Sequence, residues 1–242
     1  MKTSLKQALQ ATLAAAAFTS AAHAADLRAA PTTLEPVAGA RTATLTVINE
    51  ETRPRKVQIR VLRWTQSNGR ETLEPTRDVV ASPPFATLQG GQHYLVRVVR
   101  TAKAPPKGEE SYRVLLDEVP DPDDNKPGAV NLVLRQSIPV FFSDEPRRVS
   151  IVDWTTAREG SQLWLVAKNH GGRRLRLSDV DIDADGGSVF KQAGLVGYVL
   201  PGATMRFPIA ADPALVTDKT LHLKAASDTG RLEVSLVDNP TP

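Results

Sequence analysis

The sequence predicts an all-β protein built from two β-sandwich domains set at an angle, and three observations support this fold class. Apolar and polar residues alternate in segments such as residues 43–49 and 57–64, which is typical of half-buried strands. The 18 prolines and 15 glycines are spread along the chain and suit short strands and turns better than long helices. A polar segment with a proline, residues 143–148, separates two sets of strands and indicates a short linker.

Residues 1–24 are predicted to be a secretory signal peptide. Lys2 and Lys6 precede an alanine-rich apolar stretch that ends in a small-x-small cleavage site at Ala24. An amphipathic surface helix is the alternative interpretation of this stretch. If the segment is removed, the mature chain begins at Ala25, and an exported protein without cysteine suits a bacterial periplasm.

The charge balance of the mature chain argues against nucleic-acid binding, and its apolar segments are too short for a membrane span. Without Lys2 and Lys6 the chain has 28 basic and 27 acidic residues, so its net charge is about +1 and does not support nucleic-acid binding. No later segment approaches the roughly 18 apolar residues that a membrane-spanning helix needs, so no membrane span is expected.

The first domain is expected to cover residues 25–143. Its predicted strands are residues 26–30, 43–49, 57–64, 85–88, 94–100, 111–119 and 129–142. Their number and the length of the domain are typical of an immunoglobulin-like sandwich.

The second domain is expected to cover residues 144–242. Its predicted strands are residues 162–169, 174–182, 194–200, 204–209, 220–225 and 231–237. Two such sandwiches joined by a short linker make a bent, boomerang-like molecule with a cleft between the domains.

The sequence carries no pattern typical of an enzyme or of a cofactor site. The absence of cysteine excludes thiolate nucleophiles, iron–sulfur clusters and cysteine zinc sites. His93, His170 and His222 lie on different segments, and no nucleophile elbow, phosphate loop or paired histidine motif accompanies them. We therefore expect neither an enzyme nor a cofactor.

One acidic motif resembles the beginning of a calcium loop. Asp181, Asp183 and Asp185 stand at alternate positions before Gly186, as oxygen ligands do in such loops. The match fails at position 12, where Gln192 replaces the usual glutamate. Apolar residues alternate with the acids, which favours a strand that enters a glycine turn.

The longest predicted strand, residues 129–142, has one apolar face. Val130, Leu132, Leu134 and Ile138 lie at even positions and therefore point to the same side of the strand. Pro139 lacks a backbone N–H and is tolerated mainly at sheet edges, so this strand is expected to have a free side. An ordinary edge strand that covers its own core remains an alternative.

Two further segments give the chain a resemblance to a known family. Residues 82–98, SPPFATLQGGQHYLVRV, and residues 112–120, YRVLLDEVP, resemble segments of the PapD-like periplasmic pilus-assembly chaperones of chaperone–usher pathways. The second segment is most similar to the archaic, Csu-type branch, whose clients are spore-coat-U-like pilins. The resemblance covers the mature chain and is strongest between residues 83 and 142.

The resemblance implies a chaperone that lends a strand to an incomplete pilin sandwich. Val130, Leu132, Leu134 and Ile138 are then expected to enter the apolar groove of the pilin subunit, as in β-strand addition. The implied partners are pilin subunits and an outer-membrane usher, and the implied location is the periplasm. The sequence leaves open whether the free protein self-associates and so covers the same strand.

The sequence departs from the family at the residues that bind the terminal carboxylate of the subunit. The positions that carry an arginine and a lysine in well-studied relatives hold Thr33 and Pro139. Arg113 is the preferred substitute and Arg135 the second choice, because a guanidinium can bind a carboxylate through two hydrogen bonds. Both could instead be solvated surface arginines. A secreted structural, adhesive or calcium-binding module with the same sandwich fold is the alternative function.

Overall fold

The computed structural model describes residues 27–120, 133–146, 148–210 and 219–238. Within these ranges the chain forms sixteen strands and no helix, which confirms the all-β prediction. No helix of the described chain is long and apolar enough to cross a membrane. The predicted signal peptide, Val130 and Leu132 lie outside the described residues.

Nine strands form a first sandwich domain. They are β1 (Leu27–Ala30), β2 (Thr42–Asn49), β3 (Arg55–Ser67), β4 (Arg70–Pro75), β5 (Val79–Ser82), β6 (Phe85–Leu88), β7 (His93–Arg100), β8 (Glu109–Val119) and β9 (Arg135–Ser143). One sheet has the order β1-β2-β7-β5, and the other has the order β4-β3-β8-β9 with β6 also paired to β3. Alternate residues of each sheet, such as Leu45 and Val47 in β2 and Val114 and Leu116 in β8, are buried in the core between them.

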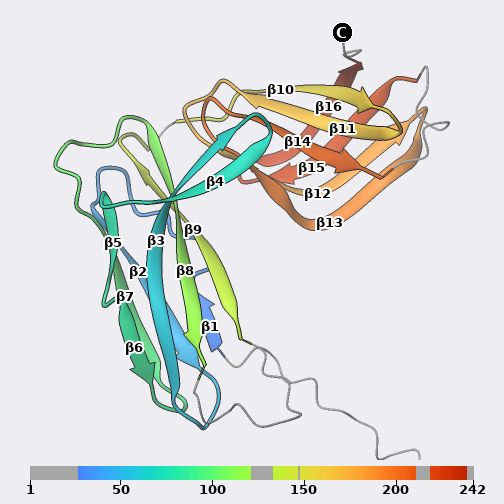
Figure 1. Cartoon of the computed structure of the whole chain (residues 1–242). Helices are drawn as coiled ribbons and strands as arrows, with labels where there is room; N and C mark the ends of the chain where they lie inside the picture. Colours follow the sequence, from blue (N-terminus) through green and yellow to red (C-terminus); the bar gives the residue numbers. More distant parts are fainter. Residues whose placement is uncertain (1–26, 121–132, 147, 211–218, 239–242) are drawn as a thin grey trace, which may run out of the picture.

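Seven strands form the second domain. They are β10 (Val152–Glu159), β11 (Gln162–Asn169), β12 (Leu175–Ala184), β13 (Gly187–Val199), β14 (Thr204–Ile209), β15 (Leu221–Ser227) and β16 (Gly230–Asp238). Their order is β13-β12-β15-β16-β10-β11-β14, and a short parallel pairing of β10 with β16 joins the two halves. A second apolar core lies between these halves. The two domains lie at an angle, as predicted (Figure 1).

Three strands were not expected from the sequence, and one is longer than expected. β4, β5 and β10 have no counterpart among the predicted strands, and β13 begins at Gly187 instead of residue 194. All six residues of β4 are exposed, so its sequence has no apolar alternation. In the part of β13 that the sequence did not predict, residues 187–193, five of the seven residues are exposed. This part therefore also lacks a buried apolar face that alternation could indicate.

A third apolar cluster joins the two domains. It consists of Trp64 and Phe141 from the first domain and Tyr198, Leu200 and Ala203 from the second. The rings of Trp64 and Tyr198 meet edge to face, with their centroids 5.4 Å apart. The domains are therefore in contact through a buried core and not through the linker alone.

The hairpin of β3 and β4 reaches from the first domain to the second (Figure 1). Its turn is Asn68-Gly69, and both residues have positive φ angles, of 51° and 72°. The backbone N–H of Gly69 donates to the carbonyl oxygen of Thr204 over 3.2 Å. Behind the turn, the Gln66 side chain donates to the carbonyl oxygen of Tyr198 and accepts from the N–H of Leu200.

Candidate functional site

Strand β9 is the edge of its sheet, and its upper part is closed by the chain itself. On one side β9 pairs with β8, with Arg113 opposite Pro139. On the other side, Leu34 donates its N–H to the carbonyl oxygen of Pro139 and accepts from the N–H of Phe141, both over 2.9 Å. Arg113 therefore stands on the strand next to β9.

The lower part of the same edge is open. Peptide groups alternate in direction along a strand, so the N–H and C=O groups of Arg135 and Ser137 point to the same side as the groups that Leu34 binds. Among the described residues, no backbone group pairs with these two residues on that side. The edge therefore offers unpaired donors and acceptors up to Pro139.

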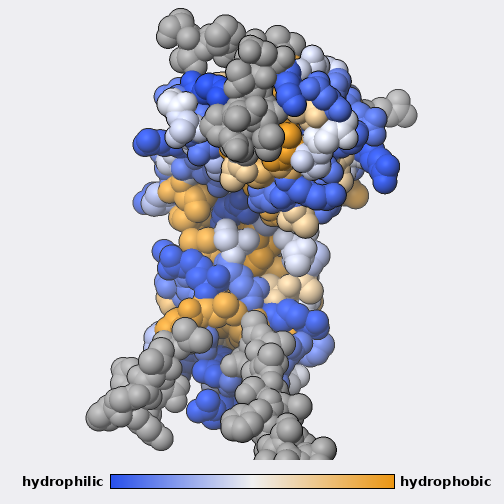
Figure 2. Space-filling view, turned by 90° about the vertical axis from the view of Figure 1, so that its right-hand side faces the viewer, coloured by the Kyte–Doolittle hydropathy of each residue, from blue (hydrophilic) through white to orange (hydrophobic). Residues whose placement is uncertain are grey.

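The described members of the predicted donor face lie toward the core of their own domain. Ile138 is 4% exposed and belongs to that core together with Val140 and Phe142. Leu134 is partly buried and packs against the margin of the core, whereas Val133, on the opposite face, is 51% exposed. In the free chain Ile138 is thus a core residue. Figure 2 shows apolar side chains at the surface on this side of the molecule, both low on the first domain and between the domains.

Arg135 already has a carboxylate partner. Its Nε donates to Asp117, which also accepts from Arg60 over 2.6 Å. Burial acts to raise the pKa of Asp117, but the hydrogen bonds from Arg135 and Arg60 outweigh it and lower that pKa. The Arg135 side chain is 63% exposed. This residue is the solvated surface arginine that the sequence left as an alternative.

Arg113 has a different environment. Its side chain is only 14% exposed, and its guanidinium carbon lies 3.7 Å from the ring centroid of Trp64 and 5.6 Å from that of Tyr198. The nearest carboxylate oxygen given by the described residues belongs to Glu71 and lies 4.0 Å away. Burial lowers the pKa of Arg113, because burial disfavours the charged form. A half-enclosed cation without a close counter-ion is an environment that favours the binding of an anion.

Arg174 provides a comparison from the second domain. Its guanidinium carbon lies 3.6 Å from the ring centroid of Phe141, in the same interdomain cluster. Unlike Arg113, it binds two carboxylates of the first domain, Glu35 over 2.5 Å and Glu109 over 2.6 Å. Arg174 therefore links the domains through two carboxylates, whereas the nearest carboxylate oxygen to Arg113 among the described residues is 4.0 Å away.

One residue of this cluster, Trp64, is recognisable from the sequence by its place on the outer face of β3. Val57, Ile59 and Val61 in β3 are buried on the core side, at odd positions. Trp64 is at an even position, on the other face, and is nevertheless 2% exposed. A large aromatic residue on the outer face of a strand indicates that another element covers it. In this chain the covering element is the second domain.

The residues of the calcium-like motif lie on the outer face of the second domain. Asp181 and Asp183 belong to β12, as the strand interpretation predicted. Asp181 accepts from Ser188 over 2.7 Å and contacts Lys191 at 3.2 Å. In the described part of the chain, no group of three or more histidine, aspartate or glutamate side chains is arranged to hold a metal ion.

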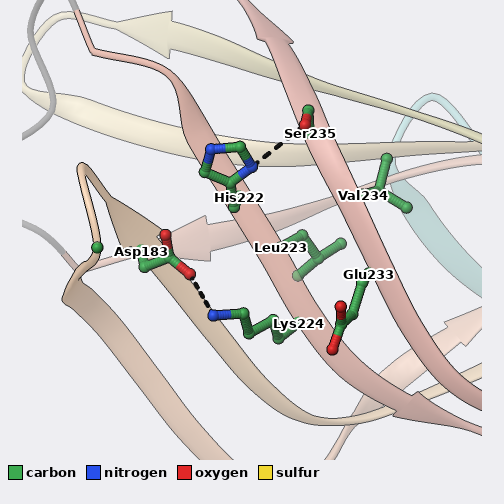
Figure 3. Close-up of a pocket in the computed structure, with 8 residues that line it drawn as sticks. Asp183, His222, Leu223, Lys224, Glu233, Val234 and Ser235 are labelled. Atoms are coloured by element: carbon green, nitrogen blue, oxygen red, sulfur yellow. Dashed lines mark hydrogen bonds and ion pairs between the residues drawn. The ribbon is translucent and has the colours of Figure 1, made fainter.

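A hollow of about 510 Å³ lies beside this motif (Figure 3). Asp183 pairs there with Lys224 over 2.9 Å, and the ring of His222 is 3.1 Å from the hydroxyl of Ser235. These side chains stand on three neighbouring strands, β12, β15 and β16. They pair across the strands, as side chains on a solvated sheet face commonly do.

Comparisons with known proteins agree with this fold. Residues 26–149 match the profile of the family described as pili and flagellar-assembly chaperones, PapD N-terminal domain. No curated protein sequence matches the chain significantly. The chain is similar to one in the crystal structure of the CsuC–CsuE chaperone–tip adhesion subunit complex, from archaic chaperone-usher Csu pili of Acinetobacter baumannii. The TM-score is 0.68 and the identity 22%, over 88% of this chain and 99% of that one.

Two further structures are similar over most of their length. For the Salmonella enterica SafA pilin in complex with the SafB chaperone, the TM-score is 0.60 and the identity 20%, over 87% of this chain and 96% of that one. For the E. coli chaperone DraB, the TM-score is 0.58 and the identity 24%, with the same coverage of 87% and 96%. These likenesses support the two-domain fold. The profile match spans more than half of the chain and confirms the resemblance found in residues 82–98 and 112–120. This chain belongs to the PapD-like family of pili and flagellar-assembly chaperones.

Proposed function

We propose that this protein is a periplasmic chaperone that binds pilin subunits along the edge of β9 and delivers them to an outer-membrane usher. The observation that carries the proposal is the open edge at Arg135 and Ser137, which ends beside Arg113, a cation whose nearest carboxylate oxygen among the described residues is 4.0 Å away. An open edge can take an added strand, and a cation at its end can bind the carboxylate that ends a polypeptide.

The backbone of β9 supplies the part of the affinity that does not depend on sequence. Arg135 and Ser137 each present one N–H and one C=O to an added strand. The added strand must stop at Pro139, because Leu34 occupies the edge from there. The binding site thus has a fixed end, and this end fixes the register of the partner.

The apolar face of the strand supplies the specific part of the affinity. Leu134 packs against the core, and the sequence predicts that Val130 and Leu132, which lie outside the described residues, belong to the same face. An incomplete pilin sandwich placed there would extend the core of the first domain, which already contains Ile138. Each apolar side chain newly buried in this way contributes about 1.5–3 kcal/mol before ordering costs.

Arg113 is the proposed anchor of the subunit's terminal carboxylate. It lies across from Pro139, one of the two positions at which well-studied relatives carry a basic residue. Its guanidinium is held against Trp64 and has no close carboxylate among the described residues. A carboxylate that binds there would offset the cost of burying this charge.

The partners and the location follow from the family and from the sequence. The similar structures include complexes of a chaperone with a tip subunit and with a pilin. The resemblance of residues 112–120 to the archaic branch favours spore-coat-U-like pilins as subunits. The predicted signal peptide, residues 1–24, would export the chain to the periplasm, where the usher receives the subunits.

A matched pair of substitutions in neighbouring residues tests the proposal. Leu134→Arg places a charge on the face that meets the subunit, and Val133→Arg places the same charge on the opposite, exposed face. We expect Leu134→Arg to abolish capture of a spore-coat-U-like pilin produced in the same periplasm, because a charge cannot enter an apolar groove unpaired. Val133→Arg should keep capture.

Copurification of the pilin with the chaperone measures capture, and thermal unfolding shows whether each variant folds. Equal capture by folded Leu134→Arg and by the unchanged chain would contradict the proposal. If Leu134→Arg does not fold, Leu134→Ser replaces it in the experiment. Reduced capture by folded Leu134→Ser would support the proposal, and normal capture would contradict it.

A further inference from the structure

The second domain contributes a wall to the site of Arg113. The guanidinium of Arg113 lies over Trp64, and the ring of Tyr198 stands 5.6 Å from it on the other domain. Tyr198 is 4% exposed, and its ring packs edge to face on Trp64. The two aromatic rings therefore limit where the guanidinium can lie, although only one of them belongs to the domain that carries Arg113.

The backbone of Tyr198 is held in place from the first domain. The Gln66 amide donates to the carbonyl oxygen of Tyr198 over 2.9 Å and accepts from the N–H of Leu200 over 2.8 Å. This pair of hydrogen bonds resembles one rung of a β-ladder made by a side chain. Rotation of the second domain would move the ring of Tyr198, and the bonds of Gln66 oppose such a rotation.

Attraction to aromatic faces adds to the weak compensation of Arg113 by Glu71, whose carboxylate oxygen lies 4.0 Å away. A cation over an aromatic ring is stabilised by the negative face of the ring, and more strongly where water is excluded. Arg174 shows the alternative within the same cluster, since two carboxylates fix its position. Among the described residues, the position of the Arg113 guanidinium is restricted by the rings of Trp64 and Tyr198 and by the Glu71 carboxylate at 4.0 Å.

We propose that Tyr198 is a positioning residue for Arg113, so that the anion-binding site of the chaperone is completed by its second domain. The inference rests on the proposed function where it concerns capture of the subunit. Its structural part, the ordering of the Arg113 side chain by Tyr198, holds for the free protein. The two parts can therefore be tested separately.

Two variants of Tyr198 separate a positioning role from a packing role. Tyr198→Phe keeps the ring, and Tyr198→Leu keeps apolar volume but removes the aromatic face. The first readout is the Nε–Hε signal of Arg113 in nuclear magnetic resonance spectra of the free chaperone. We expect a sharp signal in the unchanged chain and in Tyr198→Phe, and a broadened or lost signal in Tyr198→Leu.

The second readout is the affinity for a pilin subunit captured in the periplasm. Loss of one aromatic face should weaken binding by about threefold to tenfold in Tyr198→Leu and leave it unchanged in Tyr198→Phe. In a chain that also carries Arg113→Ala, Tyr198→Leu should have no additional effect, because the group that it positions is absent.

The outcomes distinguish this inference from the proposed anchor. An unchanged Arg113 signal in folded Tyr198→Leu overturns the inference, and so does an equal loss of affinity in the presence and absence of Arg113. If Tyr198→Leu releases the Arg113 signal but Arg113→Ala captures the subunit normally, the positioning role stands and the anchor role of Arg113 fails.

Discussion

At the scale of single residues, the two stacked arginines of the interdomain cluster differ in how their charge is compensated. Arg174 lies on Phe141 and binds Glu35 and Glu109. Arg113 lies on Trp64 without a close carboxylate. Two residues of the same type in the same cluster are thus expected to have opposite roles. We expect Arg174 to stabilise the folded protein, and we expect Arg113 to serve as the proposed anion-binding group.

Replacing each arginine by methionine tests this difference. Arg174→Met removes the guanidinium that neutralises the buried carboxylate of Glu109 and leaves it only the backbone N–H of residue 174, so we expect the free energy of unfolding to fall by about 3–5 kcal/mol. Arg113→Met removes a cation that burial disfavours, and we expect a change within about 1 kcal/mol. Urea unfolding of both variants measures the difference. An equal loss of stability in the two would show that Arg113 is structural.

At the scale of elements, the alternation of the sequence predicted the strands that have one buried face. β2, β7 and β11 have such faces and lie within a residue of their predicted bounds. β4 has no buried residue, so its only sequence signal is the Asn68-Gly69 turn before it.

The candidate site could be predicted only in part, for a related reason. The sequence identified Arg113 as a candidate, but its register opposite Pro139 becomes visible only in the structure. It could not predict that Tyr198 lies near Arg113, because the two residues are far apart in the chain and meet only where the domains dock. It also did not reveal that Leu34 closes the upper edge of β9.

A buried ion pair connects the two sheets of the first domain and makes their contact pH-dependent. Arg100 in β7 is 3% exposed and binds both carboxylate oxygens of Glu110 in β8, over 2.8 Å and 2.9 Å. The hydrogen bonds from Arg100 lower the pKa of Glu110 below its ordinary value of 4.5. An acid with a lowered pKa in the folded state stabilises the protein above its unfolded pKa, and this stabilisation is lost as the pH falls further.

Replacing this acid should reduce stability and its pH dependence together. We expect Glu110→Gln to lower the free energy of unfolding at pH 7 by about 2–4 kcal/mol, because Arg100 keeps its charge in a buried site. Between about pH 5 and pH 3 the unchanged chain should lose stability more steeply than the variant. Thermal unfolding across this pH range measures both effects. Parallel curves would contradict the assignment of the pH dependence to Glu110.

At the scale of the whole molecule, contacts on two sides of the interdomain core fix the angle between the domains. Gln66 in the β3–β4 hairpin binds the backbone of the second domain. Arg174 binds Glu35 and Glu109 of the first domain from the other side. The free protein is therefore expected to behave as one rigid bent body before a subunit arrives.

Substitution of either of two glutamines, Gln66 or Gln162, tests how far the β3–β4 hairpin contributes to this rigidity. Gln66→Ala removes the two interdomain hydrogen bonds, whereas Gln162→Ala removes bonds to Leu163 and Ile209, which lie within the second domain. We expect small-angle X-ray scattering to show a wider distribution of shapes for Gln66→Ala and the unchanged distribution for Gln162→Ala. The same narrow distribution for both variants would show that the hairpin does not hold the angle.

Hydrogen exchange at the outer edge of β9 tests directly whether a pilin subunit adds a strand to this edge. The amide of Ser137 points away from β8 and has no backbone partner among the described residues, whereas the amide of Ile138 points toward β8. When a pilin subunit binds, we expect exchange at Ser137 to slow by about a hundredfold or more, whereas exchange at Ile138 should be slow with and without the subunit. Unchanged exchange at Ser137 in a complex that protects residues elsewhere on the chain would show that the subunit does not bind along the edge of β9.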